Sequence, residues 1–161
     1  MSNVVSTGSV ARVEAAARSA GLPVSVKRMG ASTRTAAEAA AQCGCSEARI
    51  IKSLIFQGAA SKKLYLFLVP GDRMLNLAKA AALTGEAISR ADPRHVRDDT
   101  GFAIGGVSPI GHLAPIAAFA DASLLEHQTI WAAAGASDAV FEAEPAALIA
   151  LAKAKIADLT A

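Results

Sequence analysis

The stretch of the chain best suited to hold a small polar group is a glycine-rich loop, GFAIGGVSPIGH, at residues 101–112. Because glycine lacks a Cβ, Gly105, Gly106 and Gly111 allow backbone amides to approach a ligand closely. Pro109 stiffens the middle of the loop. The loop has neither the Gly-Lys-Ser/Thr ending of a P-loop nor the GxGxxG pattern of a dinucleotide site. The pattern predicts either a loop that offers amides and carbonyls to a ligand or a tight corner without one.

Lys52 is the second residue whose surroundings could serve chemistry. It lies within IIKSLIF, where strand alternation places it on the same face as Ile50, Leu54 and Phe56. An unpaired ammonium group is costly to bury, so this side chain either reaches solvent at an edge or is held for a task. We expect a functional lysine only if the glycine-rich loop lies next to it.

The cysteines and histidines do not form a recognisable metal site. Cys43 and Cys45 are the only cysteines, and a spacing of one residue is poorly suited to a disulfide between them. His95, His112 and His127 are scattered, without a paired motif such as HExxH. The sequence therefore predicts buried or half-buried thiols, no metal and no cofactor.

The elements that must position these residues are led by a β-hairpin. RIIKSLIF (49–56) and KLYLFLVP (63–70) are two β-rich runs joined by the turn segment QGAASK. Helices are expected over 9–20, 35–42, 75–85, 122–126 and 145–158, with a helical turn from Pro93 and strands over 24–27, 86–90, 114–121, 129–135 and 140–142. Helices and strands mix without regular βαβ alternation, which predicts an α+β fold around one mixed sheet, with residues 1–161 as a single domain.

Two local features of these helices can be checked directly. Thr33 is placed to cap the second helix. The last helix is expected to open at Pro145 and to bury Leu148, Leu151 and Ile156, together with Ala152, on its inner face.

The charge is modest but unevenly distributed. The formal net charge is +2, with 14 Lys/Arg against 8 Asp/Glu in residues 1–120 and 2 against 6 in residues 121–161. This permits a polyanionic partner on the side of the glycine-rich loop without requiring one. No apolar run approaches the roughly 20 residues of a membrane span, and the first residues lack a secretory pattern. We expect a soluble, cytoplasmic protein with no membrane partner.

Four segments taken in order resemble a known family. IIKSLIF, TGFAIGGVSPIGH, FADASLL and IWAAAG are similar to segments of the YbaK/ProX family of tRNA-editing proteins, which also occurs as the editing insertion of bacterial prolyl-tRNA synthetases. The likeness extends from about Val24 to Lys153, and its specificity lies in the ordered set of segments, with GxxxP at Gly105–Pro109, rather than in any single one. The resemblance implies a mixed, mostly antiparallel, barrel-like sheet surrounded by helices, of the prolyl-tRNA synthetase-associated domain type.

The resemblance also implies an activity and partners. It implies a trans-acting deacylase that hydrolyses the ester of mischarged tRNA, alanyl- or cysteinyl-tRNA for proline above all, and so supports translational fidelity. The substrate would bind through its 3′ aminoacyl-adenosine end, and prolyl-tRNA synthetase is the protein partner that the resemblance suggests. The amino acid removed and the oligomeric state stay open.

Site residues follow from the resemblance position by position. The catalytic group would be Lys52, as the family's strand lysine, with Gly105 and Gly106 of its substrate loop. The substrate-binding group would comprise the rest of that loop with its next residues, an aspartate after a strand and a pocket-lining glycine: Val107, Ser108, Pro109, Gly111, His112, Asp121 and Gly135. His112 stands where other members vary. Loop amides would stabilise an oxyanion, and no GxSxG elbow or Ser/His/Asp set calls for a side-chain nucleophile.

Simpler interpretations stand beside these. Ser108 can cap the local backbone, Asp121 can cap the helix at Ala122, and His127 and Trp131 are expected to be structural. A basic group, Arg90, Arg94, Arg97, Lys62 and Lys63, supplies either tRNA backbone contacts or ordinary surface charge. A module that binds an aminoacyl-adenosine end without turnover is the alternative function, whereas no basic helix-turn-helix supports DNA binding.

Overall fold

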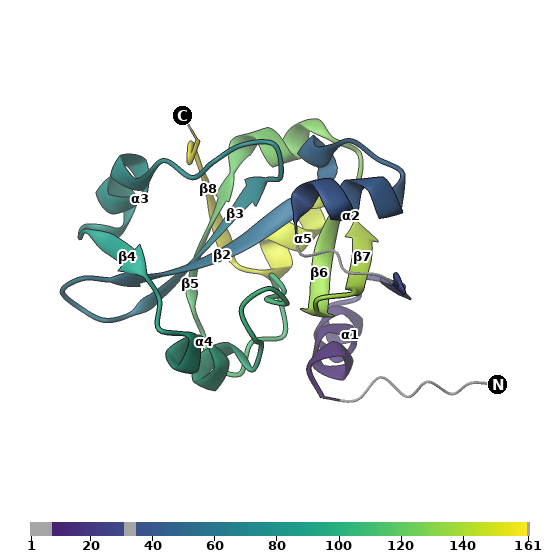
Figure 1. Ribbon diagram of the computed structural model, residues 1–161, viewed down its shortest axis with the longest axis horizontal. Helices are drawn as coiled ribbons and strands as arrows, with labels where there is room; N and C mark the ends of the chain where they lie inside the picture. The colour runs from purple at the N-terminus through teal and green to yellow at the C-terminus, as the bar shows by residue number, and fades with distance from the viewer. Residues whose placement is uncertain (1–7, 31–34, 161) are drawn as a thin grey trace.

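The protein is α+β, with two open sheets flanked by helices (Figure 1), as seen in a computed structural model that describes residues 8–30 and 35–160. One sheet has the order β1 (Val26–Arg28), β7 (Ala139–Ala143), β6 (Ile130–Ala136). The other has the order β4 (Ile88–Arg90), β2 (Ile51–Gly58), β3 (Leu64–Pro70), β5 (Ala117–Asp121), β8 (Ala154–Ala157). The α+β class is confirmed, but the strands lie in two sheets, and in the described ranges neither sheet closes into a barrel.

The predicted hairpin is the spine of the larger sheet. β2 and β3 pair antiparallel from Ile51 opposite Pro70 to Gln57 opposite Leu64. β3 pairs in parallel with β5 at its other edge, and it is buried along its whole length because each face of it packs in a hydrophobic cluster. A fully apolar strand such as LYLFLVP suits this central position.

Glu86 orders the tip of the hairpin. Its carboxylate accepts hydrogen bonds from the backbone N–H groups of Ala60 and Ser61 and from the hydroxyls of Ser61 and Tyr65. These bonds, led by that of the Ser61 hydroxyl, lower the pKa of Glu86 to about 2. Lys62 and Lys63 are consequently exposed on a tip whose backbone is fixed.

The helices begin and end at residues whose local chemistry favours it. Thr35 caps α2 in a reciprocal capping box with Glu38, while the expected cap Thr33 lies outside the described residues. Asn76 and Asp92 accept backbone N–H groups at the starts of the next two helices. The helices are α1 (Ser9–Ser19), α2 (Ala36–Cys43), α3 (Leu77–Thr84), α4 (Pro93–Thr100) and α5 (Pro145–Leu151), with 3₁₀ turns η1 (Glu47–Arg49) and η2 (Ala122–Glu126).

The C-terminal prediction is wrong in its second half. The helix expected over 145–158 ends at Leu151, and Ala154–Ala157 forms β8, parallel to β5. Lys153 adopts a positive φ of 56°, which breaks the helix between the two elements. Ile156, expected on a buried face, is 53% exposed, whereas Leu159 just beyond the strand is fully buried.

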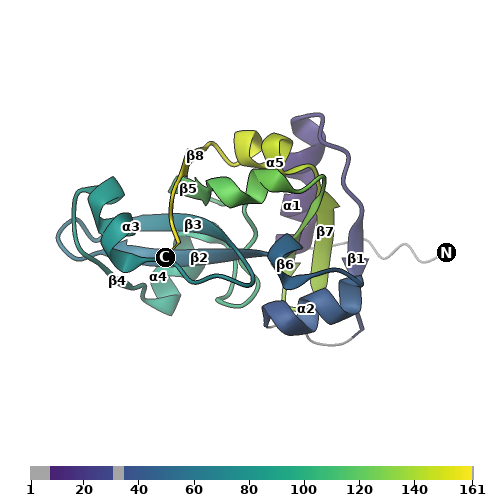
Figure 2. The same cartoon turned by 90° about the horizontal axis from the view of Figure 1, so that it is seen from above.

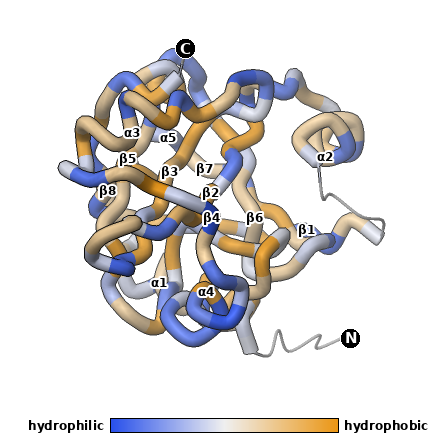
Figure 3. The backbone as a smooth tube through the Cα atoms, turned by 60° about the vertical axis from the view of Figure 1, so that its left-hand side comes forward, coloured by the Kyte–Doolittle hydropathy of each residue, from blue (hydrophilic) through white to orange (hydrophobic). Residues whose placement is uncertain are grey.

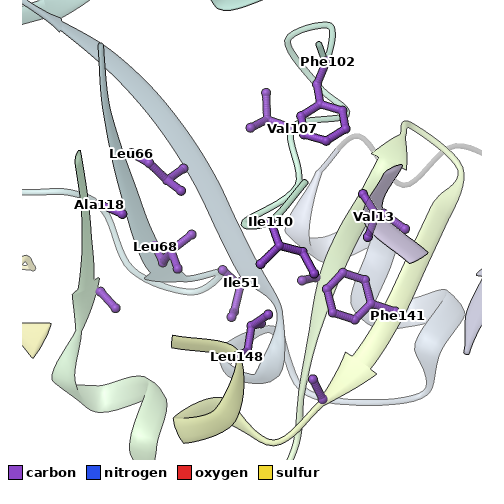
Figure 4. Packing of buried hydrophobic residues seen from close by; sticks show 14 of the residues in the cluster. Val13, Ile51, Leu66, Leu68, Phe102, Val107, Ile110, Ala118, Phe141 and Leu148 are labelled. Atoms are coloured by element: carbon purple, nitrogen blue, oxygen red, sulfur yellow. The ribbon is translucent and has the colours of Figure 1, made fainter. Parts of the chain in front are cut away.

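The core is shared between both sheets and the glycine-rich loop. Figure 4 shows Val13 of α1, Ile51 of β2 and Phe141 of β7 in one buried cluster with Leu148 of α5 and Ile110 of the loop. α1 and α2 lie on opposite sides of the three-stranded sheet (Figure 2). α4, which precedes the loop, is hydrophilic along most of its length (Figure 3). No described helix is long and apolar enough to cross a membrane.

Candidate functional site

An open cavity of about 950 Å³ lies where the two sheets separate. They are joined by a parallel bridge between Ile50 and Trp131. Beyond that bridge, the second edge of β2 pairs only with β4 at Phe56–Gly58, so far as the chain is described. The unpaired stretch between, residues 51–55, lines the cavity together with residues of β6. The cavity therefore runs along a free strand edge, where backbone N–H and C=O groups remain available.

Lys52 and the glycine-rich loop meet at this cavity, which is lined by Lys52, Ile104, Gly105 and Val107. The ammonium group of Lys52 donates a hydrogen bond to the carbonyl of Arg73, in the turn after β3. Partial burial lowers the pKa of Lys52, and the carboxylates of Asp72 and Glu47 oppose that effect. A cation is thus held at the cavity by one backbone carbonyl, which a ligand can displace.

Two residues of the loop that line the cavity, Gly105 and Val107, have backbone N–H groups that the loop's own hydrogen bonds do not use. Gly105 has a φ of +99°, and a Cβ added there would meet only open space. The N–H of Gly106 is used within the loop, bonded to the carbonyl of Ala103 at 2.9 Å. By contrast, the N–H groups of Gly105 and Val107 form no hydrogen bond within the described parts of the chain. These two amides are candidate oxyanion donors; of the expected catalytic glycines, Gly105 lines the cavity and Gly106 does not.

The rest of the loop packs inward. Ser108 is fully buried, and its Oγ accepts a hydrogen bond from the N–H of Ile110, which matches its simpler interpretation. His112 Nε2 donates to the carbonyl of Ser108 at 2.7 Å, and the imidazole lies edge-on to Phe102. Burial lowers the pKa of His112. Together with Pro109 and Gly111, these residues lie outside the lining of the cavity and shape the loop from behind.

Asp121 and Gly135 also lie outside the lining. Asp121 is buried, caps η2 through the N–H of Ser123 and accepts the N–H of Leu159 at 2.8 Å. It joins the end of β5 to the C-terminal segment. Gly135 has a φ of +96° and packs against α1, where Ser9 Oγ donates to its carbonyl at 2.7 Å. Its β6 neighbours Ala133 and Ala136 line the cavity instead.

Several lining residues were not assigned to the site from the sequence. Trp131, expected to be structural, lines the cavity, and Lys27 Nζ lies 4.9 Å from its ring centroid. Arg90, expected as a tRNA contact, also reaches the lining. Ser53 lines it too, and its buried Oγ has no hydrogen-bond partner in the part of the chain that the structure describes. Strand alternation places Ser53 and Lys52 on opposite faces of the strand, but it does not indicate that either residue borders a cavity.

The side chains that could bind a metal ion are dispersed in the described part of the chain. The described residues contain no group of three or more His, Cys, Asp or Glu placed to hold a metal ion. Cys43 and Cys45 are free thiols, and burial raises the pKa of both.

Comparison with known proteins gives consistent matches. A family model described as an aminoacyl-tRNA editing domain matches residues 31–151. A crystal structure described as "a putative trans-editing enzyme for prolyl tRNA synthetase" superposes with a TM-score of 0.89 at 45% identity, covering 96% of this chain and 98% of that one.

The protein YwhH of Bacillus subtilis (strain 168), named as uncharacterized, is 32% identical over 114 residues, 71% of this chain and 72% of its own. A protein of Enterococcus faecalis (strain ATCC 700802 / V583), named "Putative Cys-tRNA(Pro)/Cys-tRNA(Cys) deacylase EbsC", is 26% identical over 129 residues, 78% of this chain and 77% of its own.

Proposed function

The chain belongs to the aminoacyl-tRNA editing domain family, and from this premise we propose that it is a trans-acting hydrolase that cleaves the ester of mischarged tRNA. Alanyl- and cysteinyl-tRNA for proline are the proposed substrates. One observation carries the proposal: Lys52 borders one cavity with Gly105 and Val107, whose amides have no hydrogen-bond partner among the described residues. The names of two relatives, a trans-editing enzyme and a deacylase, support the same reaction class.

The reaction needs little from side chains. An aminoacyl ester is already activated, so the site must position a water, stabilise the oxyanion and grip the substrate. Water attacks the ester carbonyl, the bond to the ribose oxygen breaks, and that oxygen takes the proton, which releases the amino acid and tRNA. The amides of Gly105 and Val107 would bind the oxyanion, while Lys52 would leave the Arg73 carbonyl to bind the terminal phosphate or the ester.

The cavity suits an aminoacyl-adenosine end in size. Its volume of about 950 Å³ is at the upper end of the roughly 300–1,000 Å³ typical of small-molecule sites. Its β6 wall is built mainly from Ala132, Ala133 and Ala136, which keep the cavity wide. Trp131 adds an apolar surface near the bridge that joins the sheets.

Purified protein should release the amino acid from alanyl- or cysteinyl-tRNA for proline faster than spontaneous hydrolysis, within a panel of mischarged tRNAs. Lys52→Ala should lower kcat/KM about a hundredfold, because the variant loses the cation that would bind the terminal phosphate or the ester. Lys155→Ala, an exposed lysine of β8 outside the lining, is the matched control and should keep full activity. Release no faster than the spontaneous rate on every tRNA would contradict the function, and full activity of Lys52→Ala would remove the lysine from the mechanism.

A binding module without turnover is the second candidate. It is favoured by one observation, that the Lys52 ammonium is bonded to the backbone of Arg73 rather than to the loop. Saturable binding of a non-hydrolysable aminoacyl-adenosine analogue, combined with no ester cleavage, would identify this alternative.

A further inference from the structure

We propose that α1 braces the glycine-rich loop from behind and that Arg12 is the positioning residue through which it acts. The role of the loop rests on the proposed function, in which its amides bind the oxyanion. The brace itself is a structural statement that holds or fails independently of any activity. α1 lies outside the residues matched by the editing-domain family.

Arg12 holds both ends of the loop at once. Its Nη2 donates to the carbonyl of Gly101 at 2.7 Å, and its Nε donates to the carbonyl of Gly111 at 3.4 Å. The guanidinium carbon also lies 5.1 Å from the ring centroid of Phe102. A planar guanidinium with donors in a fixed fork is suited to such a two-point contact, which a lysine cannot reproduce. The side chain thereby closes the base of the segment that carries Gly105 and Val107.

The packing around Arg12 leaves no room for larger residues at the loop ends. A Cβ added at Gly101 would lie 2.1 Å from Arg12 Nη2, and one added at Gly111 would lie 3.2 Å from the Arg12 backbone. The close approach of α1 thus adds to the positive φ values of 79° and 82°, which already favour glycine at these two positions. In this respect they differ from Gly105, which faces open space.

Ser9, one turn earlier on α1, holds the neighbouring part of the wall. Its hydroxyl donates to the carbonyl of Gly135, at the end of β6. Ala136, next along β6, contacts the loop closely, because a Cβ on Gly106 would lie 3.1 Å from its Cα. Ala136 lines the cavity with Gly105 and Val107. One helix thus fixes two adjoining segments that form the same wall.

Such a brace matters because oxyanion donors work only when they are already in place. A misplacement of about 1 Å can cost on the order of a hundredfold in rate. The loop between Gly101 and Gly111 contains no helix or strand to hold its shape. Its order comes from the packing of its buried residues and from contacts at its ends, and Arg12 provides two of these end contacts.

The test compares Arg12→Ala with Arg12→Lys and with Arg18→Ala. Arg18 is an exposed arginine on the same helix, so its substitution matches the change in charge and helix propensity. Amide hydrogen exchange of residues 101–111, followed by mass spectrometry, is the first readout and needs no substrate. Exchange there should rise about tenfold or more in Arg12→Ala, an increase we equate with loss of one net hydrogen bond, and should stay unchanged in Arg18→Ala.

Kinetics on mischarged tRNA provide the second readout. Arg12→Ala should lower kcat on the order of 10- to 100-fold with KM little changed, because the loop acts on the transition state. Arg12→Lys should fall between, and added methylguanidinium should restore part of kcat in Arg12→Ala only. Chemical rescue of this kind would not follow from a general loss of stability.

The outcomes separate the brace from the function. Unchanged exchange and unchanged kcat in Arg12→Ala would overturn the brace, even in an active enzyme. An inactive wild type would overturn the proposed function and leave the exchange test decisive for the brace. If Arg12→Ala fails to fold, Arg12→Lys decides, and wild-type exchange in that variant overturns the proposal.

Discussion

At the scale of single residues, the site depends on polar groups left with few partners. The Lys52 ammonium has one backbone carbonyl, and the amides of Gly105 and Val107 have no partner within the described residues. Buried polar groups are normally paired, since each unpaired one costs about 1–3 kcal/mol. Groups that border a cavity can form hydrogen bonds with water, which removes much of this cost, and a ligand can later replace that water. Incomplete pairing here is consistent with a binding site.

His112 gives a prediction on pH. Burial lowers its pKa in the folded protein, and the nearby Arg12 cation acts in the same direction. The unfolded chain then takes up its proton first as the pH falls below about 6.5, so stability decreases towards the folded-state pKa. For one proton the loss cannot exceed about 1.4 kcal/mol per pH unit. Denaturant unfolding between pH 7.5 and 5 should show this loss in the wild type and a smaller one in His112→Gln.

The matched variant for that measurement is His127→Gln, at the end of η2. It should retain the wild-type dependence on pH, because its side chain lies outside the loop and its supports. An identical pH dependence in His112→Gln and the wild type would show that the imidazole does not lose its proton on folding.

At the scale of elements, the C-terminal segment allows strand and helix to be told apart by mutation. Leu159 is fully buried and its N–H bonds to Asp121, so Leu159→Ala should lower the free energy of unfolding by about 2–5 kcal/mol. Ile156 is largely exposed on β8, so Ile156→Ala should change it by less than about 1 kcal/mol. Urea unfolding measures both. A continuous helix over 145–158, with Ile156 on its inner face, would make Ile156→Ala costly.

The same segment shows what the sequence can and cannot predict about elements. The hairpin and the helical turn that begins at Pro93 depend on neighbouring residues, and the structure matches both. β8 was missed because its sequence, AKIA, has no strand pattern of its own. It becomes a strand through parallel pairing with β5, more than thirty residues earlier in the chain. Pairing of that kind is a tertiary effect that overrides local propensity.

The residues of the site also divide into those that local sequence predicts and those that depend on tertiary structure. Lys52 could be found because a lysine in an apolar strand is locally conspicuous, and the loop could be found from its glycines. Arg12 could not, because its partners Gly101 and Gly111 lie 89 and 99 residues further along the chain. Asp121 and Gly135 came from the resemblance alone, and the structure places both at packing contacts outside the lining of the cavity.

At the scale of the whole molecule, the two sheets are tied at one end and open along the cavity. Beside the Ile50–Trp131 bridge, Arg49 of η1 bonds the carbonyl of Thr129 and pairs with Glu142 of β7 at 3.0 Å. This tie fixes the distance between β2 and β6 at one end of the cavity. The cavity can thus stay formed without a ligand, which lowers the cost of ordering a site on binding.

The molecule also separates the cavity from the charges proposed to bind tRNA. Lys62 and Lys63 lie on the hairpin tip ordered by Glu86 and do not line the cavity. The double variant Lys62→Glu and Lys63→Glu should raise KM for mischarged tRNA and lower the salt slope of tRNA binding by about 2, roughly 1 for each phosphate that the tip no longer binds. Hydrolysis of a short aminoacyl-adenosine ester should be unchanged, because that substrate reaches only the cavity. The matched control reverses the charge of two lysines in the acidic C-terminal part, with the substitutions Lys153→Glu and Lys155→Glu. This double variant should leave KM near the wild-type value. An unchanged salt slope in the hairpin variant would place the tRNA contacts elsewhere, whereas equal losses on both substrates would show that the tip supports the cavity itself.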